Sequence, residues 1–90
     1  MSKEFTQEEV KKMLYRSWHR GCKETDILLG DYAKEKIFSL SNTQLLMLDK
    51  LLQVDDFHLY NWITEKVDAP EEYENEILND IKQFHRSKNA

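Results

Sequence analysis

Residues 20–26 read RGCKETD, and this stretch separates two helical patterns in a chain with only two glycines. In the pattern before it, apolar residues recur at helical spacing at Val10, Met13, Leu14 and Trp18. The pattern after it starts near Glu24. Gly21 suits the boundary because glycine readily takes the left-handed backbone conformation that ends many helices. The stretch therefore predicts a first helix that ends near His19 or Arg20, Gly21 at the C′ position, and a second helix directly afterwards.

Capping residues and apolar spacing extend this pattern to the whole chain. Capping boxes at Thr6 and Ser41 predict the starts of the first and third helices, and Asp55 and Pro70 suit the starts of the fourth and fifth. Gly30 is expected to kink or divide the second helix, since an interior glycine costs about 1 kcal/mol relative to alanine. The apolar face of the second helix is expected at Ile27, Leu28, Leu29, Tyr32, Ala33, Ile37 and Leu40, and that of the third at Leu45, Leu48, Leu51 and Leu52. The fourth helix is expected to bury Leu59, Trp62, Ile63 and Val67, and the fifth Tyr73, Ile77, Ile81 and Phe84. We expect an all-α fold, a compact bundle of about five short helices.

Length and composition limit what such a chain can be. Ninety residues suit one helical domain, 1–90, with flexible ends at 1–5 and 87–90. No apolar run approaches the roughly 20 residues of a membrane span, so no membrane insertion is expected. The single cysteine cannot form an internal disulfide, which fits a reducing compartment. The start lacks the apolar core of a secretory signal and is acidic at Glu8 and Glu9, so we expect a cytoplasmic bacterial protein, in preference to a mature mitochondrial matrix protein.

The charge is unevenly distributed along the chain. The segment from Lys11 to Lys23 contains five Lys and Arg residues and no acid, whereas residues 24–90 carry twice as many acids as Lys and Arg residues. An ordinary solvated helix face explains a basic segment equally well. The alternative is a docking surface for an acidic partner or for nucleic acid.

The motifs favour binding over catalysis. The chain has no Gly-rich phosphate loop, and its three histidines are far apart, without a metal-binding spacing. We therefore expect no catalytic, cofactor-binding or metal-binding residue. Arg20, Gly21 and Glu24 instead place a forked donor, a bare backbone and a carboxylate close together. Each could also be a routine helix-end residue, but together they are typical of a surface that another protein binds.

Two blocks of sequence resemble the succinate dehydrogenase flavinylation factors, a family of small proteins with an RGxxE motif. Residues 20–24 match the motif, and residues 51–62, LLQVDDFHLYNW, look like the second block of the family. The resemblance implies a five-helix bundle with Arg20, Gly21 and Glu24 as partner-binding residues, supported by Arg16 and Asp26. The chain departs from the family at Cys22, where members often carry Met, and residues 66–90 match poorly.

The same resemblance implies a function. Such a protein is an assembly chaperone and no enzyme: it binds the flavoprotein subunit of succinate dehydrogenase, or of fumarate reductase in some bacteria, and promotes covalent attachment of FAD to that subunit. The chemistry belongs to the partner, whose FAD is the object of the action, and the factor binds no cofactor stably. Our hypothesis is that the basic helix and corner, from Lys11 to Glu24, dock on that subunit. An antitoxin-like regulatory module is the alternative, and nucleic-acid binding is disfavoured by the acidic remainder.

Overall fold

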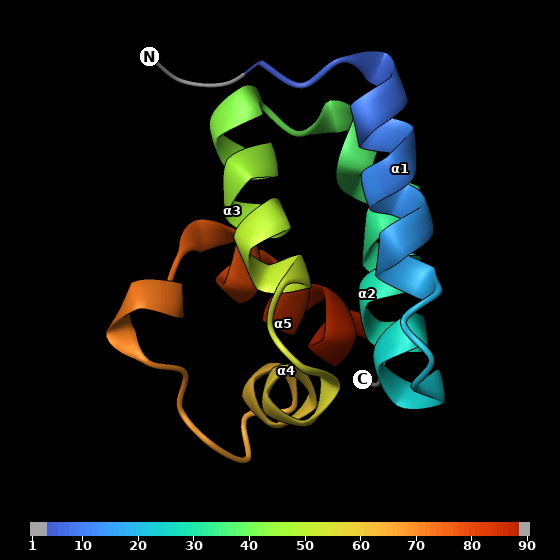
Figure 1. Ribbon diagram of the computed structural model, residues 1–90. Helices are drawn as coiled ribbons and strands as arrows, with labels where there is room; N and C mark the ends of the chain where they lie inside the picture. Colours follow the sequence, from blue (N-terminus) through green and yellow to red (C-terminus); the bar gives the residue numbers. More distant parts are fainter. Residues whose placement is uncertain (1–3, 89–90) are drawn as a thin grey trace.

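The computed structural model describes residues 4–88, and within them every element of regular secondary structure is a helix or a 3₁₀ turn (Figure 1). The all-α prediction is confirmed. The elements are α1 (Gln7–Trp18), α2 (Lys23–Lys36), the 3₁₀ turn η1 (Ile37–Ser39), α3 (Asn42–Leu52), α4 (Asp56–Ile63), the 3₁₀ turn η2 (Glu71–Tyr73) and α5 (Glu76–Lys88).

Local capping residues fix three of the helix starts, as predicted. The Thr6 hydroxyl accepts a hydrogen bond from the Glu9 amide at 3.1 Å, and the Ser41 hydroxyl accepts one from the Gln44 amide at 3.2 Å. In both boxes the third residue's side chain accepts from the cap's own amide. A carboxylate caps α4 in the same way, since Asp55 accepts from the amide of His58 at 2.9 Å.

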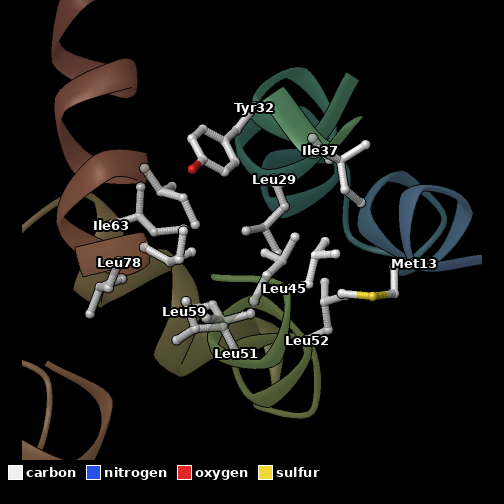
Figure 2. Packing of buried hydrophobic residues seen from close by; sticks show 14 of the residues in the cluster. Met13, Leu29, Tyr32, Ile37, Leu45, Leu51, Leu52, Leu59, Ile63 and Leu78 are labelled. Carbon is white, nitrogen blue, oxygen red and sulfur yellow. The ribbon is translucent and has the colours of Figure 1, made fainter. Parts of the chain in front are cut away.

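The five helices surround one apolar core. In Figure 1, α1 and α2 lie side by side, and α3 lies to the left of them. Helix α4 is seen end-on below α3, with α5 behind. Side chains from all five helices and from η1 meet in the interior (Figure 2). The largest fully buried side chains are Met13, Thr25, Leu29, Tyr32, Ile37, Leu48, Leu51, Leu59, Ile63, Ile77, Leu78 and Ile81. Each helix thus contributes apolar residues to the core, most of them at the positions that its spacing indicated.

Gly30 has a packing role that the sequence did not reveal. It neither divides α2 nor ends it, because α2 continues from Lys23 to Lys36. Gly30 is buried, and a Cβ built on it would lie 2.4 Å from the Cβ of Trp18 in α1. Glycine therefore lets the backbones of α1 and α2 approach closely.

Three expectations for the helix faces are wrong. Trp18 is 40 % exposed rather than buried, and the Lys34 ammonium lies 3.9 Å from its ring centroid. Ile27 is 52 % exposed, because it lies on the outer side of α2. Val67 is 54 % exposed, because α4 ends at Ile63 and the chain leaves the helical conformation at Glu65, where φ is +63°.

The segment between α4 and α5 also differs from the prediction. Pro70 precedes the short turn η2 instead of the fifth helix, which begins at Glu76. The Asn75 side chain accepts a hydrogen bond from the Leu78 amide at 2.9 Å. Asn75 therefore caps α5, whose start lies farther along the chain than the predicted start at Pro70. In Figure 1 this segment, in orange, projects from the bundle.

The chain ends are partly fixed. The Phe5 amide donates to the Asn42 side chain at 2.9 Å, and the Phe5 ring packs against the core, so residue 5 is not a free end. Ser87 belongs to α5. Lys88 also belongs to α5, and residues 1–3 and 89–90 of the predicted flexible ends lie outside the described residues.

Candidate functional site

Gly21 lies in the open corner between α1 and α2. Its φ is +94°, the left-handed region that favours glycine, as predicted. The helix ends at Trp18 with His19 as its cap, so Gly21 is one position farther from the helix than the predicted C′ position. A Cβ built on Gly21 would have no heavy atom within 4 Å. The backbone here is strained for other residues yet faces open space.

The Arg20 side chain turns inward, contrary to its expected role as a free fork. Only 11 % of it is exposed. Its Nε donates to the Asp56 Oδ1 at 2.6 Å, its Nη1 donates to the Leu52 carbonyl oxygen at 2.8 Å, and its Nη2 donates to the Val54 carbonyl oxygen. These acceptors lie at the end of α3, in the connection that follows and at the start of α4, so the guanidinium fastens the α1–α2 corner of the bundle to the α3–α4 corner.

Asp56 joins the two sequence blocks. Besides Arg20, its Oδ1 accepts a hydrogen bond from the Thr25 hydroxyl at 2.8 Å, and Thr25 is fully buried. Asp55, the preceding residue, caps α4 as expected, whereas Asp56 is the first residue of the helix. The hydrogen bonds from His58 to the Asp55 carboxylate, first of all the one from the backbone amide, lower the pKa of Asp55.

The two predicted supporting residues have separate roles. Asp26 lies at the corner, where its Oδ1 accepts a hydrogen bond from the Arg20 amide at 2.7 Å. Arg16 points to α3 instead, and its Nη1 lies 3.0 Å from the Asp49 Oδ1. The structure therefore brings Arg20, Gly21, Glu24 and Asp26 together and places Arg16 elsewhere. Arg16 and Arg20, two of the five Lys and Arg residues of the basic segment, thus form ion pairs within the bundle. The segment therefore offers less free positive charge than a docking helix was expected to offer.

A hollow of about 500 Å³ lies beside the corner, between the starts of α2 and α4. It is lined by Cys22, Glu24, Asp56, Phe57, Tyr60 and Asn61. Glu24 is exposed on its rim, and Phe57 is 73 % exposed. Helical spacing places Phe57 and Tyr60 off the apolar stripe of the fourth helix, but the sequence gives no signal that they adjoin the corner. Asn61 carried no signal at all.

Neither a metal-binding cluster nor a membrane-spanning helix is found among the described residues. Within residues 4–88 no three His, Cys, Asp or Glu side chains gather in a way that could hold a metal ion. In the same range, every helix is too short or too polar to cross a membrane. The corner presents a carboxylate, an exposed ring and an accessible backbone.

Comparison with known proteins identifies the family. The family described as "Flavinator of succinate dehydrogenase" matches residues 11–85. The chain belongs to this family. The match extends into α5 as far as residue 85, so the poor resemblance expected for residues 66–90 is corrected: the family pattern includes most of that segment.

Curated relatives carry the name "Succinate dehydrogenase assembly factor 2, mitochondrial". One from Dictyostelium discoideum is 43 % identical over 88 % of this chain and 55 % of its own length. One from Danio rerio is 34 % identical over 87 % and 51 %, and one from Candida glabrata is 35 % identical over 86 % and 53 %. The chain thus spans about half the length of the curated relatives it matches. These flavinator relatives are named as assembly factors, in agreement with the expectation of a non-enzymatic role.

The expected location is wrong. We expected a bacterial cytoplasm, whereas the relatives from a slime mould, a fish and a yeast are all named as mitochondrial. Their names point to mitochondria. The expectation relied on the first residues of the chain, and those residues do not decide the compartment.

Proposed function

We propose that this chain binds the flavoprotein subunit of succinate dehydrogenase and promotes covalent attachment of FAD to it. The related subunit of fumarate reductase is a second partner of the same chemistry. The name of the family, "Flavinator of succinate dehydrogenase", supports this proposal, as do the names of the relatives. The FAD belongs to the partner, and the chain itself holds no cofactor in the proposal.

The observation that carries the proposal is the rigid and open corner at Gly21. A buried guanidinium and the Asp26 carboxylate hold the backbone on one side, and the other side faces open space. A surface that is ordered before binding loses little conformational entropy when a partner docks. Glu24, exposed next to it, supplies a charge for specificity. Holding the subunit in one geometry favours attachment chemistry that the subunit and its flavin perform.

A pair of substitutions at Gly21 tests the proposal. Gly21→Ala and Gly21→Arg place the same strain on the left-handed backbone, about 1–2 kcal/mol, but only arginine fills the space in front of it. We expect the purified flavoprotein subunit to be recovered with the wild-type chain and with Gly21→Ala, and to be lost with Gly21→Arg. Circular dichroism serves as the control that both variants fold. Recovery of the subunit with Gly21→Arg at the same level as with Gly21→Ala and the wild type would show that the partner does not approach this corner.

A further inference from the structure

We propose that the hollow between α2 and α4 receives an arginine side chain of the partner. This inference depends on the proposed function and specifies the chemistry of its contact. The charged residues that line the hollow are Glu24 and Asp56, both acidic, and its rings are Phe57 and Tyr60. Acidic side chains beside aromatic rings are complementary to a side chain with a cationic head and an apolar stem.

Glu24 is the carboxylate available for this contact. The Asp56 Oδ1 already accepts hydrogen bonds from Arg20 and Thr25. The Glu24 carboxylate is exposed, and within residues 4–88 its contact is with the Cys22 thiol at 3.4 Å, which is a weak donor. Glu24 therefore keeps the capacity to accept two hydrogen bonds from a guanidinium.

The inward turn of Arg20 determines the sign of the charge that the site prefers. Its guanidinium is compensated by Asp56 and shielded from solvent, so it does not attract an acidic partner group. The start of α2 contributes a partial positive charge of about half an elementary charge, which the full charge of Glu24 exceeds. The hollow is thus suited to a partner cation, the opposite of the contact first expected for Arg20.

Other occupants fit less well. An apolar side chain would cover Glu24 without pairing it, and burying an unpaired carboxylate is unfavourable. An acidic side chain would be repelled. Lysine offers a point charge, whereas the planar guanidinium of arginine can stack on Phe57 and bind the carboxylate with two parallel hydrogen bonds. The Tyr60 ring already has the Lys66 ammonium 5.0 Å from its centroid. The exposed Phe57 ring, at 73 %, is placed for such stacking.

Calorimetric titration with the purified flavoprotein subunit of succinate dehydrogenase tests the carboxylate and the ring. Glu24→Gln keeps the shape and removes the charge, and we expect it to weaken binding about 10- to 100-fold. Phe57→Ala should weaken it to a smaller extent. The matched controls are Glu35→Gln, an exposed acid elsewhere on α2, and Phe38→Ala, an exposed ring on η1, and both should bind like the wild type.

A double-mutant cycle tests the identity of the occupant. Each surface arginine of the flavoprotein subunit is changed to Gln and titrated with the wild-type chain and with Glu24→Gln. We expect one of these changes to weaken binding to the wild type by a similar factor and to have little effect on binding to Glu24→Gln. If every arginine change has the same effect on both chains, or if Glu24→Gln binds as tightly as the wild type, the arginine contact is wrong. Failure of the wild type itself to bind the subunit would instead overturn the proposed function.

Discussion

Removal of the Asp56 carboxylate is expected to destabilise the fold far more than removal of a similarly exposed carboxylate nearby. Asp56→Ala leaves the Nε of Arg20, whose side chain is 11 % exposed, without its acceptor. It also removes the shorter hydrogen bond of the fully buried Thr25 hydroxyl, which keeps only the Cys22 carbonyl oxygen at 3.3 Å. Breaking a buried ion pair costs about 3–5 kcal/mol, and breaking an exposed one costs at most about 1 kcal/mol. Asp56 is 30 % exposed, and Arg20 keeps two carbonyl acceptors. We therefore expect a loss of about 2–3 kcal/mol from a free energy of unfolding of roughly 5–13 kcal/mol.

Asp49→Ala is the matched control. Asp49 is 29 % exposed, nearly the same as Asp56, and it also pairs with an arginine, but that arginine is 46 % exposed. The expected loss is within about 1 kcal/mol. Urea unfolding followed by far-UV circular dichroism measures both variants. Equal losses for the two substitutions would refute the claim that the buried guanidinium fastens the two corners of the bundle together.

Three further predictions concern the packing and the helix starts. Gly30→Ala should destabilise the fold despite the higher helix propensity of alanine, because a Cβ would meet Trp18 at 2.4 Å; thermal unfolding with an unchanged or higher midpoint would contradict this. Burial, together with the hydrogen bond to Asp80, raises the pKa of Tyr32 above its usual value of about 10, so the folded state keeps a proton that the unfolded state releases. Stability should therefore fall as the pH rises above about 10, and less steeply in Tyr32→Phe. Ser41→Ala should cost about 1 kcal/mol in urea unfolding through loss of the α3 cap, and a loss indistinguishable from zero would argue against that cap.

The sequence predicted those features that depend on neighbours in the chain. The capping boxes at Thr6 and Ser41 and the left-handed Gly21 follow from residues a few positions apart. The apolar stripes of α3 and α5 follow from helical spacing alone. These features suffice for the fold class, because amphipathic helices of this length must bury their apolar faces against one another.

The features that the sequence did not reveal depend on residues far apart in the chain. Arg20 meets its acceptors across 32 to 36 residues, so nothing near it in sequence indicates that its guanidinium is buried. The contact of Gly30 with Trp18 joins two helices in the same way. Helical spacing alone places Phe57 off the apolar stripe of α4, but its place beside Glu24 depends on how α4 lies against α2.

Covalent flavin on the dehydrogenase subunit is the measurement that tests the central claim most directly. The flavoprotein subunit is produced in cells that lack the native factor, together with the wild-type chain, Gly21→Ala, Gly21→Arg or no factor, and is then separated under denaturing conditions. Flavin that remains fluorescent on the denatured subunit is covalently attached. We predict strong fluorescence with the wild type and Gly21→Ala, and little with Gly21→Arg or without the factor. Equal fluorescence in all four samples would contradict the claim that this chain promotes flavin attachment through its Gly21 corner.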